Sequence, residues 1–518
     1  MGLFGTAGVR GSVETRVTPA LALRVGRAVA AVARDHITES ADTATTDDGH
    51  DRPEVVVARD GRVTGPALTA AVEAGLASGG VRVARAGQLP TPALAYASRG
   101  RYGVMLTASH NPPGDNGIKL FADGVEFDRR HERAVEDRVD AADPPASWDE
   151  WTTPVVEDPL APYLSAVEAY ARELPVGTPT DSAAVDLNGL RIAVDCGNGM
   201  AAPATPAVLR ELGATVVTLN GNVDGHFPGR GSKPTPETLA DLRAFVADAN
   251  AGVDDPGRDG TGFAFGIGHD GDADRIVVVD GDGAVVHEDT VLAILAGHYV
   301  DASDVADPVV VTTPNASARI DERVEAAGGR VERVRLGALH EGIAAVRADA
   351  ADEARVDEDG VDETGAADLA TDDGHAATAR TAVVFAAEPW KHVHPAFGGW
   401  IDGVCSAAVL ARLVAAVGLE PLCEPVSERP YRKTSVDCPD EAKAAVMDRL
   451  IDRLPSAFPA AAVDTDHGVR LAFSDASWVL VRPSGTEPYV RVYAESDTVD
   501  ALTDDVRELV EAAVDAVT

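Results

Sequence analysis

A serine and a histidine stand side by side in the segment Thr107–Pro113, which reads TASHNPP and follows an apolar run. The two prolines, and the Gly-Asp-Asn-Gly that comes next, predict a loop. Ligands of α/β folds bind to loops that follow strands. Ser109 is therefore a candidate nucleophile, with His110 or Lys119 as its neighbour in a reaction. The alternative is an ordinary loop, in which the serine hydroxyl only satisfies backbone groups.

Three carboxylates, Asp270, Asp272 and Asp274, recur at every second position of the sequence DGDADR, which lies between two apolar runs. Acidic groups this close together repel one another unless a cation lies between them, and such hard oxygen ligands suit Mg²⁺. An EF-hand is excluded because the sixth position of the loop is Arg275 and not glycine. This arginine could hold a phosphate beside the metal ion. The alternative is a solvated acidic turn.

The segment RPSGTEP, near the C-terminus, combines an arginine, two hydroxyls and a glycine. An arginine fork beside exposed backbone N–H groups makes a nest for phosphate, and an ordinary hairpin loop is the alternative. The candidate phosphate ligands are Arg482, Ser484, Gly485 and Thr486.

A fourth segment, Gly197–Ala202, reads GNGMAA and matches the G-x-G-x-x-A pattern of dinucleotide-binding turns. Such a site needs an acidic residue at the end of the next strand, but this sequence has Asn220 at that position. We therefore interpret the segment as a tight turn between a strand and a helix.

The charge of the chain narrows the classes of partner. Its 518 residues include 84 acidic and 45 basic side chains, which gives a net charge of −39. Nucleic acids and anionic membranes would repel such a surface, so neither is an expected partner. An acidic surface with very few lysines is typical of proteins that work in concentrated salt, where the Debye length falls to about 3 Å at 1 M. A functional acidic surface is the alternative.

The four cysteines are scattered and form no CxxC pair, which argues against a disulfide scaffold and against a cysteine-rich zinc site. The N-terminus lacks the pattern of a signal peptide, and no run of about 18 apolar residues occurs. We expect a cytoplasmic protein.

The elements that must position these motifs alternate between short apolar runs and amphipathic stretches. A repeated strand–helix–strand order predicts α/β units with a largely parallel sheet. The expected strands are 54–58, 81–84, 104–107, 191–195, 215–219, 263–267, 276–279, 308–313 and 329–334, and the expected helices are 65–78, 202–212 and 319–327. The last stretch differs, because strands 478–482 and 489–495 meet at a tight turn and a helix over 499–517 follows. This order predicts a small α+β domain.

Boundaries near residues 157, 282 and 424 divide the chain into domains 1–157, 158–282, 283–424 and 425–518. Two acidic segments, 38–52 and 349–379, are poor in apolar residues. Neither can bury enough apolar surface to offset the entropy lost on ordering, so both are expected to be loops within domains.

The serine loop, the DGDADR loop, RPSGTEP and the opening GTAGVRG, in this order and spacing, resemble the α-D-phosphohexomutase family. That family includes phosphoglucomutase, phosphomannomutase and phosphoglucosamine mutase. The resemblance spans nearly the whole chain. It implies three α/β domains with mixed, largely parallel sheets and a smaller C-terminal α+β domain, arranged around a central cleft.

The resemblance also implies roles for the motif residues. Ser109 would carry the phosphoryl group and, together with Asp270, Asp272 and Asp274, hold one Mg²⁺ per chain. The acid–base and electrostatic groups around the phosphoserine would be Arg10, His110 and Lys119. The substrate would be bound by Arg275, Glu388, His392, Arg482, Ser484, Gly485 and Thr486. The last four would hold the phosphate that is not transferred.

One motif departs from the family pattern. The sugar-binding loop usually reads Gly-Glu-x-Ser-Gly-His, whereas the aligned residues here read AEPWKH. Glu388 and His392 keep their spacing, but Trp390 and Lys391 replace the serine and the glycine. This change leaves the identity of the sugar open. His394, which follows, is interpreted as a packing residue of the loop.

The resemblance predicts an isomerase that moves a phosphoryl group between C1 and C6 of a hexose, through a phosphoserine enzyme and a bisphosphorylated sugar. Glucose and mannose phosphates are the expected substrates. Glucosamine phosphate is the alternative, because the altered loop is where an amino group would be recognised. Two rival classes are a phosphatase of the Asp-nucleophile kind, which would use Asp270 and Asp272 with Ser109 only structural, and a non-catalytic protein that binds a metal or a sugar phosphate. The oligomeric state, monomer or dimer, is left open.

Overall fold

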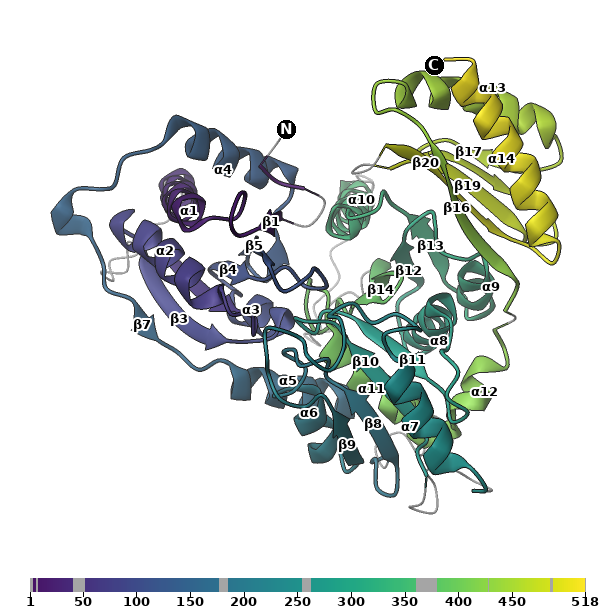
Figure 1. The fold of residues 1–518 in the computed structure, drawn as a ribbon, viewed down its shortest axis with the longest axis horizontal. Helices are drawn as coiled ribbons and strands as arrows, with labels where there is room; N and C mark the ends of the chain where they lie inside the picture. The colour runs from purple at the N-terminus through teal and green to yellow at the C-terminus, as the bar shows by residue number, and fades with distance from the viewer. Residues whose placement is uncertain are drawn as a thin grey trace, which may run out of the picture. The chain divides into compact units, whose positions relative to one another are not determined.

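The computed structural model describes residues 3–5, 8–40, 52–176, 185–253, 262–359, 380–426, 428–484 and 488–517. The chain forms two compact units, whose elements are labelled in Figure 1. Unit 1 consists of residues 1–288 and 390–422, and unit 2 of residues 289–389 and 423–518. The finer division into four domains stays a prediction.

The N-terminal part of unit 1 contains a mixed sheet with the strand order β1-β5-β4-β2-β3-β7. β2 pairs in parallel with β3 and β4, whereas β5 runs antiparallel to β4 and β1. β2 is a run of buried valine and alanine, which is typical of a strand covered on both faces. The strands are β1 (Val9–Ser12), β2 (Glu54–Arg59), β3 (Arg82–Gln88), β4 (Tyr102–Leu106), β5 (Asp115–Ala122), β6 (Val125–Glu126) and β7 (Val155–Val156).

The helices of this part pack closely because of small residues. A Cβ atom on Gly26 would lie 2.4 Å from the carbonyl oxygen of Val72, and one on Gly75 would lie 2.3 Å from that of Leu23. Only glycine therefore allows α1 and α2 to approach this closely. The helices are α1 (Pro19–Ser40), α2 (Gly65–Ser78), α3 (Thr91–Ala97) and α4 (Arg129–Ala141), followed by the 3₁₀ turn Trp148–Glu150.

The second sheet of unit 1 has the order β11-β10-β8-β9. β10 pairs in parallel with β8 and antiparallel with β11, so the DGDADR loop joins two neighbouring antiparallel strands. The strands are β8 (Arg191–Asp195), β9 (Thr215–Leu219), β10 (Phe265–His269) and β11 (Ile276–Val279), with the short β15 (Lys391–Val393) nearby in the same unit. The helices are α5 (Leu160–Glu173), α6 (Thr205–Glu211), α7 (Ala240–Asn250), α11 (Gly403–Val417) and α12 (Leu419–Cys423).

Unit 2 begins with a parallel arrangement in which β12 pairs with both β13 and β14. These elements are β12 (Asp307–Thr312), β13 (Arg330–Arg333) and β14 (Thr381–Glu388), with helices α8 (Glu288–Asp301), α9 (Arg319–Ala326) and α10 (Leu339–Asp359). The C-terminal part is an antiparallel sheet with the order β16-β20-β19-β18-β17. Its elements are β16 (Tyr431–Asp437), α13 (Lys443–Ala457), β17 (Ala462–Asp464), β18 (Val469–Ala472), β19 (Trp478–Pro483), β20 (Tyr489–Glu495) and α14 (Val499–Asp515).

The α/β class, the mostly parallel sheets and the antiparallel C-terminal α+β part are confirmed. One expectation is wrong in part: residues 349–359 belong to helix α10 and are not a loop. Their alanines and long charged side chains have high helix propensity, so the helix continues beyond its apolar start. Likewise α1 extends to Ser40, into the first acidic segment, and most of both segments lies outside the described residues.

Helix α6 begins at Thr205, three residues later than expected, because Pro206 suits the first turn of a helix and not its interior. Within the part of the chain that the structure describes, no helix is both long and apolar enough to cross a membrane.

Candidate active site

Ser109 lies at the end of β4, in a loop whose backbone bends sharply at the serine itself. Its φ angle is +50°, which lies in the left-handed region that residues other than glycine rarely occupy. The side chain is fully buried, and its Oγ donates a hydrogen bond of 2.6 Å to Asp270 Oδ2. His110 Nδ1 lies 3.3 Å from the same Oγ. The serine loop of the first sheet and the aspartate loop of the second sheet thus meet at one hydroxyl.

The aspartate loop between β10 and β11 brings its three carboxylates together. One oxygen from each of Asp270, Asp272 and Asp274 lies within 4.8 Å of the others, and all three side chains are buried. Gly271 lets this loop lie against the serine loop, because a Cβ atom there would lie 2.6 Å from the carbonyl oxygen of Ser109. The left-handed conformation of Ala273, with φ of +61°, turns the third carboxylate toward the other two.

The carboxylate oxygens fit a cation. Among the described residues, no hydrogen-bond donor reaches Asp272 Oδ1 or Asp274 Oδ1, although both atoms are buried. Burial, Asp274 and Asp272 together raise the pKa of Asp270 well above its ordinary value. A divalent cation would compensate this repulsion and satisfy the two oxygens, and the all-oxygen donor set suits a hard metal ion. The three aspartates therefore form a group that could hold a metal.

Thr91, at the start of α3, holds one of these carboxylates in place. Its Oγ1 donates a hydrogen bond of 2.6 Å to Asp272 Oδ2, and its backbone N–H donates one of 3.0 Å to the Asp272 carbonyl. Groups that orient metal ligands in this way tune the site as much as the ligands do. Thr91 was not predicted as a site residue, because 181 residues separate it from the aspartate that it orients.

Two cations face the carboxylates. Lys119, which β5 contributes, lies with Nζ 2.9 Å from Asp274 Oδ2 and 3.5 Å from Asp272 Oδ2. Burial alone would lower the pKa of Lys119, but Asp274 and Asp272 raise it above its ordinary value. Arg275 Nε lies 3.7 Å from Asp270 Oδ2 and 3.6 Å from Asp274 Oδ1. Lys119 therefore stays charged beside the serine, and Arg275 adds a guanidinium group, which is not deprotonated in proteins.

His110, in contrast to these two cations, is neutral. Burial, together with Arg275 and Arg10, lowers the pKa of the His110 imidazole far below its ordinary value, so the ring is neutral near pH 7. A neutral ring can accept a proton. Arg10 lies on β1, opposite Gly117 of β5, and its Nε is buried without a hydrogen-bond partner among the described residues. The structure thus brings Arg10, His110 and Lys119 to the surroundings of Ser109.

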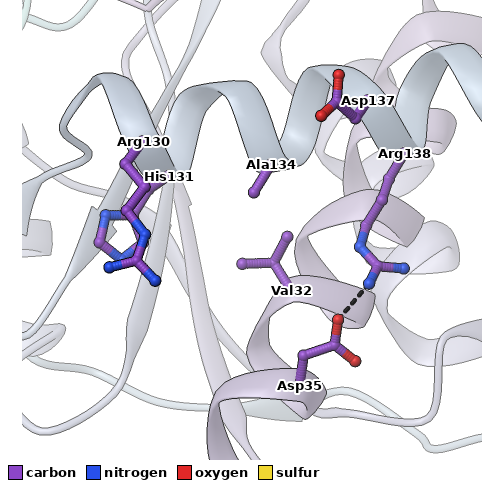
Figure 2. A pocket seen from close by; sticks show the side chains of 7 residues that line it. All are labelled: Val32, Asp35, Arg130, His131, Ala134, Asp137 and Arg138. Atoms are coloured by element: carbon purple, nitrogen blue, oxygen red, sulfur yellow. Dashed lines mark hydrogen bonds and ion pairs between the residues drawn. The ribbon is translucent and has the colours of Figure 1, made fainter.

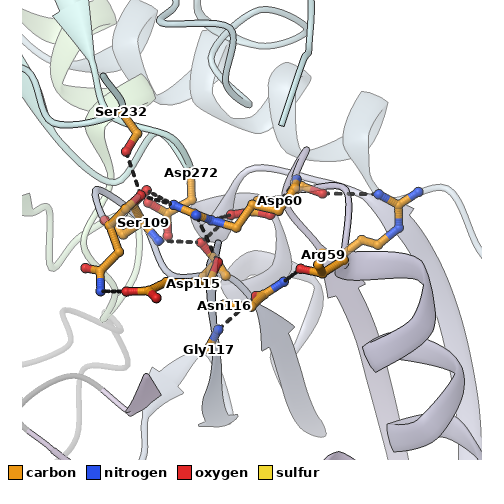
Figure 3. Close-up of polar contacts among 12 residues, drawn as sticks. Arg59, Asp60, Ser109, Asp115, Asn116, Gly117, Ser232 and Asp272 are labelled. Atoms are coloured by element: carbon orange, nitrogen blue, oxygen red, sulfur yellow. Dashed lines mark hydrogen bonds and ion pairs between the residues drawn. The ribbon is translucent and has the colours of Figure 1, made fainter. Parts of the chain in front are cut away.

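A second group that the sequence analysis missed is formed by Asp60 and Arg62, directly after β2. Arg62 Nη2 donates a hydrogen bond of 2.8 Å to the Ser109 carbonyl, and Asp60 Oδ2 accepts one of 2.8 Å from Thr107 Oγ1. Figure 3 shows Asp60, Ser109 and Asp272 among the polar contacts of this region. In the same region Ser232 Oγ donates a hydrogen bond of 3.0 Å to the carbonyl of Asn111. The sequence signal was available, because RDG follows a buried strand as the other motifs do, but charged residues after strands are common.

The Gly197–Ala202 segment forms the tight turn that was expected. Gly197 and Asn198 both have a φ of +55°. A Cβ atom on Gly199 would lie 2.7 Å from the carbonyl oxygen of Gly271. The glycines of this turn thus let it pack against the aspartate loop, which accounts for them without a dinucleotide.

The expected phosphate ligands lie in unit 2, at the turn between β19 and β20. Arg482 Nη2 donates a hydrogen bond of 3.1 Å to the Tyr493 hydroxyl, and the Ser484 carbonyl accepts one of 2.7 Å from Lys443 Nζ. Gly485 and Thr486 lie outside the described residues.

The two expected sugar ligands, Glu388 and His392, have different hydrogen-bond partners. Glu388 ends β14 in unit 2, where its Oε1 accepts a hydrogen bond of 2.5 Å from the Gly337 N–H. His392 belongs to unit 1 and is 1% exposed, with Nδ1 3.1 Å from Ser406 Oγ. His394 Nε2 lies 2.9 Å from the same hydroxyl, in agreement with its expected packing role. A sugar-binding role for His392 therefore stays a prediction.

Lys391 comes close to the aspartate loop through the backbone. It forms an isolated β-bridge with Arg275, and the carbonyl of Trp390 accepts a hydrogen bond of 3.2 Å from the Ile276 N–H. The positive charge of Lys391 contributes to lowering the pKa values of both His110 and Asp274. Lys391, which departs from the family pattern, is thus part of the electrostatic surroundings of the site.

A separate cavity of about 400 Å³ lies between α1 and α4 (Figure 2). Two of its lining residues have acidic partners: Arg138 forms ion pairs with Asp35 and Asp143, and His131 forms a hydrogen bond with Asp128. None of the residues discussed around Ser109 lines this cavity.

Comparison with known proteins finds matches over most of the chain. Family models of phosphoglucomutase/phosphomannomutase match the chain over residues 1–146 (alpha/beta/alpha domain I), 163–283 (alpha/beta/alpha domain II) and 435–513 (C-terminal domain). The chain is 37% identical over 508 residues to the phosphopentomutase of Thermococcus kodakarensis, covering 96% of this chain and 94% of the relative. It is also 37% identical over 524 residues to a probable phosphoglucosamine mutase of Methanopyrus kandleri, covering 99% and 97%.

Among solved structures, a phosphoglucomutase/phosphomannomutase family protein from Burkholderia thailandensis superposes with a TM-score of 0.74. The identity is 23%, and the match covers 99% of this chain and 97% of that one. At this identity the likeness concerns the fold.

Proposed function

Because the chain belongs to the phosphoglucomutase/phosphomannomutase family of the α-D-phosphohexomutases, it is an isomerase of the phosphotransferase kind. We propose that it interconverts the 1-phosphate and 6-phosphate of a neutral hexose, such as glucose or mannose, through phosphorylated Ser109 and a bisphosphorylated sugar. The observation that carries this proposal is the 2.6 Å hydrogen bond between Ser109 Oγ and Asp270, which puts a hydroxyl next to a three-carboxylate group.

Asp270, Asp272 and Asp274 would hold a divalent cation, which we propose to be Mg²⁺. When bound, such an ion polarises phosphoryl oxygens and offsets their charge. Phosphoryl transfer otherwise depends mainly on positioning and on neutralising the three equatorial oxygens. Lys119 and Arg275, both charged and both at the carboxylate group, are placed to do this for a phosphoryl group on Ser109.

The proton of the attacking sugar hydroxyl needs an acceptor. When that hydroxyl attacks the phosphorus, a new P–O bond to the sugar forms and the P–O bond to Ser109 breaks. His110 Nδ1 lies 3.3 Å from Ser109 Oγ, so the imidazole can pass the proton from the sugar hydroxyl to the serine oxygen as that oxygen leaves the phosphorus. In the reverse step the ring takes the proton from the Ser109 hydroxyl as the serine attacks the phosphorus, and it returns the proton to the sugar oxygen that leaves.

The second phosphate of the sugar requires a holding site. We assign it to Arg482 and Ser484, together with Gly485 and Thr486, because an arginine fork and hydroxyls beside a glycine bind phosphate. The bisphosphorylated sugar would turn over, so that each phosphate occupies this site and the serine site in turn. Glu388 would bind sugar hydroxyls as a hydrogen-bond acceptor.

The charge of Lys391 supports a neutral sugar. A cation that acts on both His110 and Asp274 would also repel the ammonium group of glucosamine phosphate. The names of the relatives favour two other substrates, glucosamine phosphate and pentose phosphate. A coupled assay on the 1-phosphates of glucose, mannose, glucosamine and ribose, in concentrated KCl, separates these alternatives.

The phosphoserine is tested by the variant Ser109→Ala. We expect the intact mass of the purified wild-type chain to show a covalent phosphate, and we expect the variant to lose both this phosphate and at least about 1,000-fold in kcat. The control is Ser98→Ala, another fully buried serine, which only caps α3 through the carbonyl of Ala95. Unchanged turnover in Ser109→Ala with release of free phosphate would instead support a phosphatase of the Asp-nucleophile kind, which uses Asp270 and Asp272. Binding without any turnover would support a binding protein.

A further inference from the structure

We propose that Arg62 and Asp60 are positioning residues, which hold Ser109 in the backbone conformation that aims its hydroxyl at Asp270. The inference rests on the proposed role of Ser109 in phosphoryl transfer. Neither Arg62 nor Asp60 touches a reacting atom, and both act on the serine through its two peptide groups.

The guanidinium of Arg62 uses every donor that it has. Its side chain is fully buried, and its Nε donates to Asp60 Oδ2 at 3.0 Å. The other four donors go to backbone carbonyls of the serine loop, namely those of Ser109 (2.8 Å), Asn111 (2.7 Å), Pro112 (2.6 Å) and Asp115 (3.0 Å). An arginine has five N–H donors in a rigid planar fork, so this set is complete. One side chain thus fixes the path of the loop from the serine to the start of β5.

Asp60 holds the other side of the serine through Thr107. Its Oδ2 accepts a hydrogen bond of 2.8 Å from Thr107 Oγ1, and Thr107 Oγ1 in turn accepts one of 2.8 Å from the Ser109 N–H. Asp60 Oδ1 accepts a hydrogen bond of 2.9 Å from the backbone N–H of Arg62. The N–H and the carbonyl of Ser109 are therefore held by two ends of one buried ion pair.

The serine needs this support because of its backbone conformation. A φ of +50° is sparsely populated for a residue with a side chain, and such conformations persist only where the surroundings determine them. If the loop relaxed, the hydroxyl would move away from Asp270 Oδ2. Displacements of about 1 Å cost roughly 100-fold in rate when positioning supplies the catalysis.

The environment of Arg62 keeps the pair dry and fixed. The ring of Phe227, itself at a φ of +52°, lies 5.1 Å from the guanidinium carbon. Gly225 packs against the backbone of Gly61, which lies between Asp60 and Arg62, since a Cβ atom on Gly225 would be 2.5 Å from the Gly61 carbonyl oxygen. The segment around Phe227 therefore covers the ion pair from the side of the second sheet.

A matched pair of variants separates positioning from simple packing. Arg412 is also buried and lies on α11. It also donates to backbone carbonyls, and these carbonyls, of Ala171, Arg172, Leu174 and Val185, all lie outside the serine loop. We expect Arg62→Lys to lower kcat by about 100-fold with KM changed less than about threefold, and to lower the phosphate content of Ser109. Arg412→Lys should lower the thermal midpoint about as much as Arg62→Lys does, but its kcat should stay within about twofold of wild type.

The threonine provides a second test that does not depend on the folding of the arginine variant. Thr107→Val removes the hydroxyl link and should lower kcat at least about tenfold, whereas Thr107→Ser keeps the link and should restore kcat to within about threefold of wild type. Equal kcat losses in Arg62→Lys and Arg412→Lys, or in the two threonine variants, would overturn the inference. A wild-type chain with neither phosphate on Ser109 nor turnover of any sugar phosphate would overturn the proposed function itself, and with it this inference.

Discussion

Groups that look alike in the sequence have different charge states in the folded site. Burial and two neighbouring aspartates raise the pKa of Asp270, whereas burial is outweighed at Asp274, where Lys119 and Arg275 lower the pKa well below its ordinary value. His110 is neutral beside these charges. A site that contains an acceptor for a proton, a carboxylate group and two fixed cations has the parts that phosphoryl transfer needs.

Lys391 provides a prediction at this scale. Replacing it by the glycine that the family uses, in Lys391→Gly, removes a cation and should raise the ratio of kcat/KM for glucosamine 1-phosphate to that for glucose 1-phosphate by about tenfold. Lys391→Arg keeps the charge and is the control, with an unchanged ratio expected. If Lys391→Gly leaves the ratio as it is, the lysine does not select against an amino sugar.

At the scale of elements, strand ends and helix starts are joined by buried polar groups. The N-terminus of α11 is capped by Asp402, which accepts the Cys405 N–H at 2.8 Å. Ser406 in the same turn donates to the Asp402 carbonyl at 2.7 Å, so the rings of His392 and His394 must both donate to its oxygen. Both rings can make this bond while neutral, which connects β15 and the loop after it to the start of α11.

This connection predicts acid lability of unit 1. Burial holds the pKa of His394 at about 3 in the folded chain, compared with about 6.5 when unfolded. The unfolded chain therefore binds protons first as the pH falls, and stability is full above about pH 6.5 and is lost progressively toward pH 3. At pH 5 the loss amounts to about 2 kcal/mol for this histidine.

Denaturant unfolding at pH 8 and pH 5, at constant salt, measures this loss through a probe in unit 1. His394→Gln keeps a donor for Ser406 but does not titrate, so its stability should fall about 2 kcal/mol less than that of the wild type between the two pH values. An identical fall in both proteins would contradict the predicted role of His394.

At the scale of the whole molecule, net charge governs the response to solvent. A chain with 84 acidic and 45 basic residues repels itself at low ionic strength. We propose that this composition is an adaptation to concentrated salt. Raising KCl from 0.1 M to 3 M should raise both the thermal midpoint and the activity. The reason is that exposed charges more than about 3 Å apart are already largely screened from one another at 1 M salt.

A neutral osmolyte at matched osmolality is the control for this salt experiment, since it stabilises proteins without screening charge. Equal gains in KCl and in osmolyte, or a thermal midpoint that does not depend on salt, would contradict the proposal that the acidic composition is an adaptation to concentrated salt.

Local chemistry in the sequence determined most of the architecture. Apolar runs and turn residues act over a few positions, which is why β8, β9, β11, β20 and the helix Gly65–Ser78 lie where the patterns predict. The motifs that contain Ser109 and the three aspartates could also be identified, because their residue types and spacing carry the chemistry by themselves. The helical start of the second acidic segment was missed, because composition shows poor burial but not residual helix propensity.

Only the tertiary structure decided which groups meet. Ser109 and Asp270 are 161 residues apart, Thr91 and Asp272 are 181 apart, and no periodicity along the chain relates them. Four of the five side-chain hydrogen bonds of Arg62 likewise depend on a loop 47 to 53 residues further along. Such contacts arise when whole sheets pack, so their distances, their burial and the resulting pKa shifts are properties of the folded molecule and not of any segment.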